Sequence, residues 1–303
     1  MLFAGGEKNL GAARLTWRMA FGGRFWWFFV DRSGLVHDTR WVPGSRGPER
    51  DNTCIYFLLK GSFEAFSQVE KRIDAPAALA LSEEQLEGAS EKRTLSFRAS
   101  GEPFVALHLH VPNSLLAVDP PKNCGDPPVV LALDQAAWTC AHAVAERSRA
   151  AADDSLEPMQ HLVRALVEQK ILHPEALRPI TVKTPAPLEL LWKGLRPMVE
   201  RLYLTPTVEE VSGATGISVR QVDRYVGQFL ERFGHLGGTG WRLATRHMRL
   251  KLAVLWLSAE GVSVSDVATA TSYGSADAMA RAFRDVGLPT PSKVQSELRQ
   301  VPR

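Results

Sequence analysis

The sequence predicts an α+β multidomain protein, in which an N-terminal antiparallel β-sandwich of the jelly-roll type precedes an all-α domain with two helix-turn-helix motifs. Three observations carry this prediction. The first part of the chain contains at least six short apolar runs separated by turn residues, without a long helix between them. After residue 128 the hydrophobic period changes from two to 3.6 residues, as in helices. Finally, a helix-turn-helix pattern occurs twice between residues 207 and 284.

Length and composition are compatible with a two-domain cytoplasmic protein. The chain has 303 residues, of which 45% are hydrophobic. Its three cysteines, Cys54, Cys124 and Cys140, are widely spaced and form no C-x-x-C pair, which predicts ordinary thiols rather than a disulfide framework or a zinc site. No apolar run is long enough to cross a bilayer, and the N-terminus lacks the pattern of a secretory signal. We therefore expect no membrane association.

Positive charge is concentrated at the C-terminal end. The formal net charge is +3, but from Thr184 onward there are 15 Lys and Arg against 11 Asp and Glu, a net of +4. The remainder carries a net of −1. This uneven distribution is a weak electrostatic indication of DNA binding by the C-terminal part.

Residues 1–23 show no clean hydrophobic period, and we expect an arm that is ordered only by packing. Aromatic and β-branched runs then predict a series of strands. These strands span residues 25–30, 35–42, 53–60, 63–66, 77–81, 94–98 and 104–111. Gly61 and Ser62 separate two of the runs as a hairpin turn would.

Two histidines and several aromatic residues in these strands could contact a small molecule. His108 and His110 share one face of a strand, because side chains alternate along it. Two histidines alone are not a complete ligand set, so we predict neither a metal nor a cofactor and place them in a pocket or on a solvated face. Trp26, Trp41 and Phe63 are candidates for stacking on an effector, with ordinary core packing as the alternative.

A helical connector follows the strands. Residues 111–128 are rich in Pro, Asn and Asp and read as a linker, after which Asp134 is placed to cap a first helix and residues 156–172 form a second. The apolar stripes of these helices pack either on another subunit or back on the β-domain. Three prolines within residues 177–187 mark a boundary. We therefore divide the chain into a β-domain (1–128), a connector and candidate dimer interface (129–183), and a helical domain (184–303).

The first helix-turn-helix unit has defined starts for both of its helices. Thr207 and Glu210 have the spacing of a capping box, and so do Ser218 and Gln221. Gly216 stands in the turn, where a positive φ is needed. The N-terminal turns of the second helix resemble a recognition helix that enters the major groove. Its candidate DNA contacts are Ser218, Arg220, Gln221, Asp223 and Arg224.

A second unit repeats this pattern some 56 residues later, counted from Ser212 to Ala268. A helix over residues 241–258 joins the units, and Arg242, Arg246 and Arg249 share one of its faces. These arginines either contact phosphates or pair with acidic residues of the neighbouring units, with Arg249 the best candidate for a structural role. Further candidate DNA contacts are Arg242, Arg246, Ser275, Asp277, Arg281 and Arg284.

Three motifs carry a resemblance to a known family. They are V-E-E-V-S-G-A-T-G-I-S-V-R-Q-V-D-R-Y, R-L-K-L-A and S-Y-G-S-A-D-A-M-A-R-A-F-R. Residues 188–294, which contain them, resemble the DNA-binding domain of AraC/XylS-type transcriptional regulators. The resemblance implies seven helices, with two recognition helices that enter successive major grooves. The strands, especially I-Y-F-L-L-K-G-S-F, are similar to the cupin-like sensor and dimerisation domain of such regulators.

The chain departs from the family pattern mainly in its second unit. Ser272 stands where the family usually has a turn glycine, and Met279 where it usually has an aromatic residue. Ala276 and Asp277 occupy positions where the family often places DNA-contacting side chains. Alanine can touch only a thymine methyl group, and aspartate repels phosphate. We therefore expect the first unit to carry most of the base readout.

Taken together, these features predict a sequence-specific DNA-binding transcription regulator that is not an enzyme. The expected partners are double-stranded DNA, a second copy of the chain, a small-molecule effector and RNA polymerase. An activator is one expected class of regulator, but the residues do not distinguish activation from repression. One alternative is a regulator controlled by a protein partner without a small molecule. Another is a cupin-type metalloenzyme with an appended helical domain, for which His37 is a distant third ligand candidate.

Overall fold

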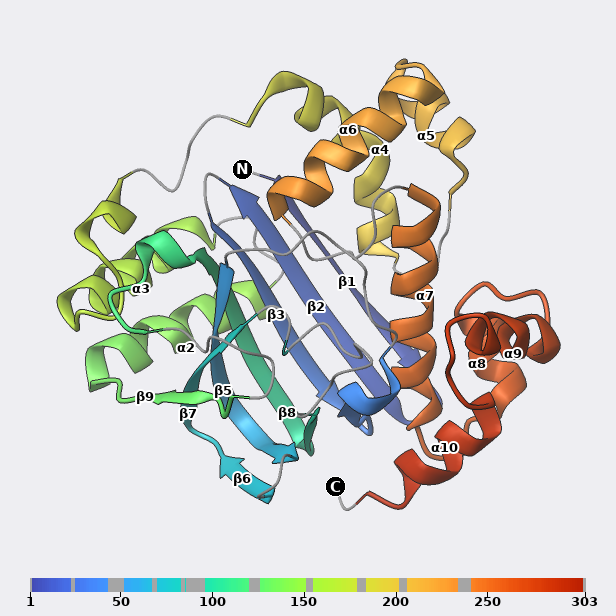
Figure 1. Cartoon of the computed structure of the whole chain (residues 1–303), viewed down its shortest axis with the longest axis horizontal. Coiled ribbons are helices and arrows are strands. Elements are labelled where there is room, and N and C mark those ends of the chain that lie inside the picture. The colour runs from blue at the N-terminus through green and yellow to red at the C-terminus, as the bar shows by residue number, and fades with distance from the viewer. Residues whose placement is uncertain are drawn as a thin grey trace.

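The predicted fold class is confirmed by the computed structural model, in which an antiparallel β-region is followed by helices (Figure 1). The structure describes residues 2–22, 25–42, 52–66, 70–82, 85, 96–119, 126–150, 155–178, 184–201, 206–233 and 241–301. Within this part of the chain, no helix is long and apolar enough to cross a membrane.

The nine described strands form one antiparallel sheet. The order is β1-β2-β3-β8-β5-β7-β9, while β4 pairs with β8 and β6 with β5. The strands are β1 (Leu2–Leu10), β2 (Ala13–Gly22), β3 (Phe25–Ser33), β4 (His37–Asp38), β5 (Asn52–Phe66), β6 (Glu70–Asp74), β7 (Ala77–Ser82), β8 (Ser96–Pro112) and β9 (Val129–Leu131). Short 3-10 helices occupy Thr39–Trp41, Asn113–Leu115 and Pro174–Leu177.

The predicted N-terminal arm is wrong, because β1 and β2 form a regular antiparallel hairpin within residues 2–22. The sequence shows no alternation of apolar and polar residues here, because β2 is covered on both faces. Trp17, Met19 and Phe21 are buried on one face, and Ala20 is buried on the other. A strand that is buried on both faces does not need alternating polar residues.

The predicted hairpin at Gly61 is also wrong, because β5 runs through it as one strand. Gly61 has φ +94°, and the β5–β8 register shifts between Leu58 and Ser62, which marks a bulge. A Cβ atom at Gly61 would lie 2.6 Å from the carbonyl oxygen of Ser100. The glycine therefore permits close approach of β8 rather than a chain reversal.

Two other strand predictions differ in extent from the structure. The run predicted over 94–98, of which residues 96–98 are described, and the run 104–111 join into the single strand β8 across Gly101 and Pro103. The strand expected over 35–42 is reduced to the two residues of β4, because Asp38 caps the 3-10 helix that follows it. Its carboxylate accepts a hydrogen bond from the backbone N–H of Arg40 at 3.0 Å.

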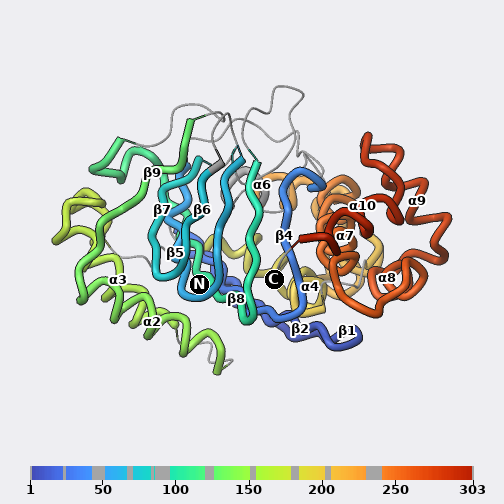
Figure 2. The backbone as a smooth tube through the Cα atoms, turned by 90° about the horizontal axis from the view of Figure 1, so that it is seen from below, coloured from blue at the N-terminus to red at the C-terminus, as the bar shows by residue number. Residues whose placement is uncertain are grey.

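Helices cover both faces of the sheet. The connector helices α2 (Gln135–Arg149) and α3 (Leu156–Glu168) pack on one face, so their apolar stripes turn back on the β-region. Arg149 strengthens this packing through an ion pair of 2.9 Å with Asp31 of β3. Asp134 caps α2 as predicted. The helix α3 ends at Glu168, before the expected residue 172, and Lys170 beyond its end adopts φ 58°. In Figure 2, α2 and α3 lie on one side of the strands and α7 to α10 on the other.

In the described parts of the C-terminal region, residues 184–201, 206–233 and 241–301, there are seven helices. They are α4 (Ala186–Glu200), α5 (Val208–Thr215), α6 (Val219–Phe233), α7 (Trp241–Leu257), α8 (Val264–Ala270), α9 (Ala276–Arg284) and α10 (Pro291–Arg299). The long helix α7 joins the α5–α6 unit to the α8–α9 unit (Figure 1).

The β-region contacts both helix-turn-helix units and shares a hydrophobic core with them. On the first unit, the ring of Phe229 in α6 lies 5.2 Å from that of Phe21 in β2, measured between ring centres. On the second unit, the Lys8 ammonium of β1 donates a hydrogen bond to the carbonyl oxygen of Ala270 in α8. The two units are therefore held against the same β1–β2 hairpin.

Candidate nucleic-acid interface and the adjoining cavity

The first helix-turn-helix unit is built by the local signals that the sequence contains. The amide of Glu210 donates to the Thr207 hydroxyl at 3.1 Å, and the amide of Thr207 donates to the Glu210 carboxylate at 2.6 Å. This capping box satisfies backbone donors at the start of α5. Gly216 ends α5 with φ +70°, as predicted for the turn. The Ser212 hydroxyl then donates to the carbonyl oxygen of Ile217 at 2.5 Å, which ties α5 to the turn.

The N-terminal turns of α6 are exposed and carry two arginines. Ser218 and Gln221 form the second predicted capping box, with hydrogen bonds of 3.0 and 3.4 Å between their backbone amides and side chains. Arg220, Asp223 and Arg224 are exposed. Since Ser218 and Gln221 are held by each other, the arginines are the better equipped of these candidates for contacting a ligand.

The two arginines of α6 differ in their surroundings. Arg224 donates to the Tyr225 hydroxyl at 3.1 Å, and its guanidinium carbon lies 4.9 Å from the centre of that ring. Among the described residues, Arg220 makes neither a hydrogen bond nor an ion pair with another side chain. Its five donors are therefore available to an incoming acceptor.

The second unit has the same frame with different surface chemistry. Ser275 caps α9 by accepting from the amide of Ala278 at 3.1 Å. Met279 and Phe283 are fully buried, as the sequence predicts for inward-facing positions. The exposed candidates on α9 and its cap are Ser275, Asp277, Arg281 and Arg284. Asp277 lies in the first turn of α9, where it adds negative charge to the N-terminal end of the helix.

The arginines of α7 divide into different roles. Arg249 donates to the carbonyl oxygen of Thr271 at 3.1 Å and to that of Ser272, and it lies 4.1 Å from the ring centre of Tyr273. It therefore holds the turn of the second unit. Arg246 pairs with Asp285 at 3.0 Å, whereas Arg242 is exposed.

A cavity of about 220 Å³ lies between the inner face of the sheet and α7. Its walls are mainly apolar and come from five strands, the first 3-10 helix and α7. Four of the five residues proposed to bind an effector line this cavity, namely Trp26, Phe63, His108 and His110. The fifth, Trp41, is half-buried in the 3-10 helix and does not line it.

Two cationic side chains in the cavity wall were missed by sequence reasoning. Arg32 of β3 is buried, donates to the carbonyl oxygen of Ala99 at 2.8 Å and lies 3.8 Å from the ring centre of Phe104. Burial lowers the pKa of Arg32 to about 10, so it remains charged at neutral pH. Lys251 enters from α7. Both residues reach the cavity wall only because α7 docks on the sheet, and no local sequence motif predicts that packing.

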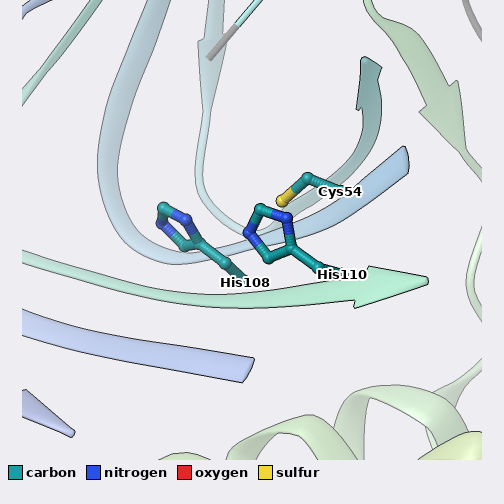
Figure 3. Close-up of side chains that lie close together, drawn as sticks. All are labelled: Cys54, His108 and His110. Atoms are coloured by element: carbon teal, nitrogen blue, oxygen red, sulfur yellow. The ribbon is translucent and has the colours of Figure 1, made fainter. Parts of the chain in front are cut away.

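The two histidines lie beside a cysteine that the sequence did not connect with them. His110 stacks on Trp26 with ring centres 3.5 Å apart, and His108 packs 4.3 Å from Tyr56. Burial, reinforced by neighbouring His110, His37 and Arg32, holds the pKa of His108 well below its usual value, so the imidazole is neutral. The thiol of Cys54 projects towards the His110 ring (Figure 3). One potential ligand atom from each of Cys54, His108 and His110 lies within 4.8 Å of the others.

Comparisons with known proteins reveal only distant similarity. No family model and no curated protein sequence matches the chain. Among solved structures, it is similar to ToxT from Vibrio cholerae with a bound unsaturated fatty acid, at 13% identity and a TM-score of 0.39, covering 94% of this chain and 100% of that one. It is also similar to the AraC-like transcriptional activator CuxR, at 13% identity and a TM-score of 0.30, covering 72% of this chain and 74% of that one.

A third similarity concerns the β-region alone. The cupin domain of Schizosaccharomyces pombe Cnp3 matches at 13% identity and a TM-score of 0.20, covering 33% of this chain and 66% of that one. CuxR is described as AraC-like, and the matched part of Cnp3 is described as a cupin domain.

Proposed function

We propose that the protein is a sequence-specific transcription regulator whose two helix-turn-helix units bind double-stranded DNA. The observation that carries the proposal is the pair of capped helices α6 and α9, both of which expose residues of their N-terminal turns. Exposed first turns on a rigid frame are the means by which recognition helices reach base edges in the major groove. No catalytic step is part of this proposal.

The two units contribute unequally in this proposal. Arg220 and Arg224 of α6 are exposed, and an arginine side chain can donate two hydrogen bonds to one guanine. On α9, Arg281 and Arg284 supply positive charge for the phosphate backbone, while Asp277 opposes it. The first unit therefore reads sequence, and the second mainly positions the protein.

Selection of bound sequences from a random DNA pool tests the proposal directly. We expect one enriched motif, whose affinity falls steeply with salt because phosphate contacts release counterions. A pool that shows no enrichment over successive rounds, although the protein is folded, would contradict the proposal. If the protein bound scrambled DNA as tightly as the enriched motif, its DNA binding would be non-specific.

We further propose that the cavity binds a small effector with an apolar body and an acidic group. The walls supply apolar surface, while Arg32 and Lys251 supply positive charge. A molecule in this position touches strands and α7 at once, so its binding can depend on how the helical region is docked. Such a ligand shifts DNA binding only if its affinity differs between the two docked arrangements.

A thermal-shift comparison tests the effector class. Carboxylic acids with apolar chains of graded length are compared with the corresponding primary amides, which have nearly the same shape without the charge. We expect stabilisation by an acid and little by its amide. Equal responses to both members of each pair would contradict the role of the two cations. No response to either would favour control by a protein partner instead.

We propose that the protein binds DNA as a homodimer. If it activates transcription, RNA polymerase is a further partner. The edge strand β9 supports dimerisation, because among the described strands it pairs only with β7 and it exposes Val130 at 52% and Val129 at 36%. An apolar edge of this kind can pair with a second copy. Sedimentation of the wild-type protein and of Val130→Lys tests this, since the charged residue should shift the protein towards monomer.

A further inference from the structure

Cys54, His108 and His110 meet on the inner face of the sheet. Cys54 of β5 lies directly opposite His110 of β8 in the antiparallel register. His108 precedes His110 by two residues, so both imidazoles project from the same face of β8 (Figure 3). The sequence-based expectation of no metal relied on the lack of a third ligand, and the pairing of β5 with β8 supplies one.

The chemistry of this trio matches that of a transition-metal site. A thiolate and two neutral imidazoles are ligands that zinc and its neighbours prefer. Ligand atoms around one tetrahedral zinc ion lie roughly 3.3–3.6 Å apart, given Zn–N and Zn–S bonds of about 2.0–2.3 Å. The three potential ligand atoms lie within 4.8 Å of one another, so they need to approach by at most about 1.5 Å. Side-chain rotation can supply such a movement without a change of strand register.

The surroundings hold the trio in place and leave one side accessible. Trp26 stacks on His110 with an interplanar angle of 15°, and Tyr56 packs against His108. The buried Nε2 atom of His108 has no hydrogen-bond partner among the described residues, as expected for a nitrogen that awaits a ligand. Both histidines also line the cavity between the sheet and α7. A cation held between them would therefore adjoin that cavity.

We propose that Cys54, His108 and His110 bind one thiophilic divalent cation of the zinc class, with the fourth coordination position open to the cavity. The cation forms one bond to the Cys54 sulfur and one to a ring nitrogen of each histidine. The thiol loses its proton to solvent on binding, so the bound unit of cation and thiolate carries one net positive charge. Water or a donor atom of a cavity molecule fills the remaining position.

This inference is independent of the proposed DNA binding and can fail separately from it. Cation binding is measured on the purified, tag-free chain without DNA. If selection from the random DNA pool succeeds and no cation binds, only the present inference is lost. If a cation binds and no DNA motif is enriched, only the proposed function is lost.

The experiment uses Co²⁺ as a spectroscopic probe and Zn²⁺ as a competitor on chelator-treated protein. We expect one Co²⁺ per chain, an intense thiolate-to-cobalt charge-transfer band in the near ultraviolet, and loss of that band when one equivalent of Zn²⁺ is added. The double variant Cys124→Ser/Cys140→Ser is the matched control, because Cys54 is then the sole thiol. Its band should equal that of the wild-type protein.

Variants of the ligands complete the test. His108→Gln and Cys54→Ser should each weaken Zn²⁺ binding by roughly tenfold or more, since even the outer partners of metal ligands contribute tenfold to a hundredfold. Circular dichroism establishes that each variant is folded. If Cys54→Ser does not fold, the cysteine double variant and His108→Gln decide the question. The proposal is overturned by absence of the band in the double variant, by Zn²⁺ binding below one equivalent, or by unchanged affinity in folded His108→Gln.

Discussion

The indole N–H of Trp17, in the middle of β2, donates a hydrogen bond of 2.7 Å to the backbone carbonyl oxygen of Val199 near the end of α4. This carbonyl is one of the last acceptors of the helix, which have no partner within the helix itself. Trp17 is fully buried. The β-region thus completes the hydrogen bonding of a helix in the other region, which gives their docking a defined geometry.

Replacement of Trp17 by phenylalanine should destabilise the protein by about 1–3 kcal/mol, because it leaves the buried Val199 carbonyl unsatisfied while most of the apolar contact remains. Urea unfolding measures the change. Trp138→Phe is the control, since Trp138 lies in α2 on the opposite face of the sheet. A loss no greater than that of the control would show that the hydrogen bond contributes little.

On the proposed function, Arg220→Ala should weaken binding to the selected DNA motif by about 1–3 kcal/mol and relax preference at one base pair, because a bidentate base contact is lost. Arg224→Ala should act similarly at a second position. Fluorescence anisotropy with motif and scrambled duplexes measures both effects. Unchanged discrimination between the two duplexes would remove these arginines from base readout.

In contrast, Asp277→Ala should leave specificity nearly unchanged and strengthen DNA binding modestly, since a negative charge is removed from the first turn of α9. Arg284→Ala is the companion variant, and it should weaken binding to all duplexes alike by removing a phosphate contact. A large loss of specificity in Asp277→Ala would mean that the second unit reads bases after all.

Backbone conformation in the two turns predicts a pair of opposite stability effects. Ser272 adopts φ 59°, and Ser272→Gly should stabilise the protein by about 0.5–1 kcal/mol because glycine tolerates this region. Gly216 has φ +70° with no atom within 4 Å of an added Cβ, so Gly216→Ala should destabilise by about 1 kcal/mol through conformation alone. Thermal unfolding measures both. Effects of the same sign would contradict this account.

Stability should fall as the pH is lowered from 6.5 towards 4, in part because of His247. Burial, followed by the nearby charges of Lys251 and Arg246, lowers the pKa of His247 from 6.5 to about 4. The unfolded chain therefore takes up a proton at this position before the folded chain does, and unfolding is favoured between these pH values. Above pH 6.5 the histidine is neutral in both states and has no such effect.

His247→Gln isolates this contribution, because glutamine has no proton to gain. The free energy of unfolding is measured by urea titration at several pH values between 7.5 and 4.5. The difference between wild-type protein and variant should change steadily in favour of the variant as the pH falls below 6.5. A difference that is independent of pH would show that His247 titrates normally in the folded chain.

The sequence predicted those features that depend on residues close together in the chain. Both capping boxes, Thr207 with Glu210 and Ser218 with Gln221, join residues three apart, so their spacing alone indicates them. The positive φ of Gly216 was likewise predictable, because a glycine stands at the turn between two helices that are adjacent in sequence. The β-hairpin at the N-terminus escaped prediction because burial on both faces of β2 removes the alternation that marks a strand.

Features of the candidate sites that depend on strand register could not be predicted. Cys54 and His110 are 56 residues apart in sequence, and only the pairing of β5 with β8 places them side by side. Arg32 and Lys251 both line the cavity because α7 docks on the sheet, and no motif in either segment predicts that packing. The sequence thus singled out His108 and His110, but not Cys54, whose potential ligand atom lies within 4.8 Å of theirs.

The N-terminal hairpin touches α6 through Phe21 and α8 through Lys8. On the proposed function, the helical phase at which the two units meet a duplex is therefore set outside the DNA-binding domain. A change within the hairpin, residues 2–22, would then alter which number of base pairs between half-sites is tolerated, without any change in a residue that touches DNA. Operator architecture and β-strand sequence would then evolve together.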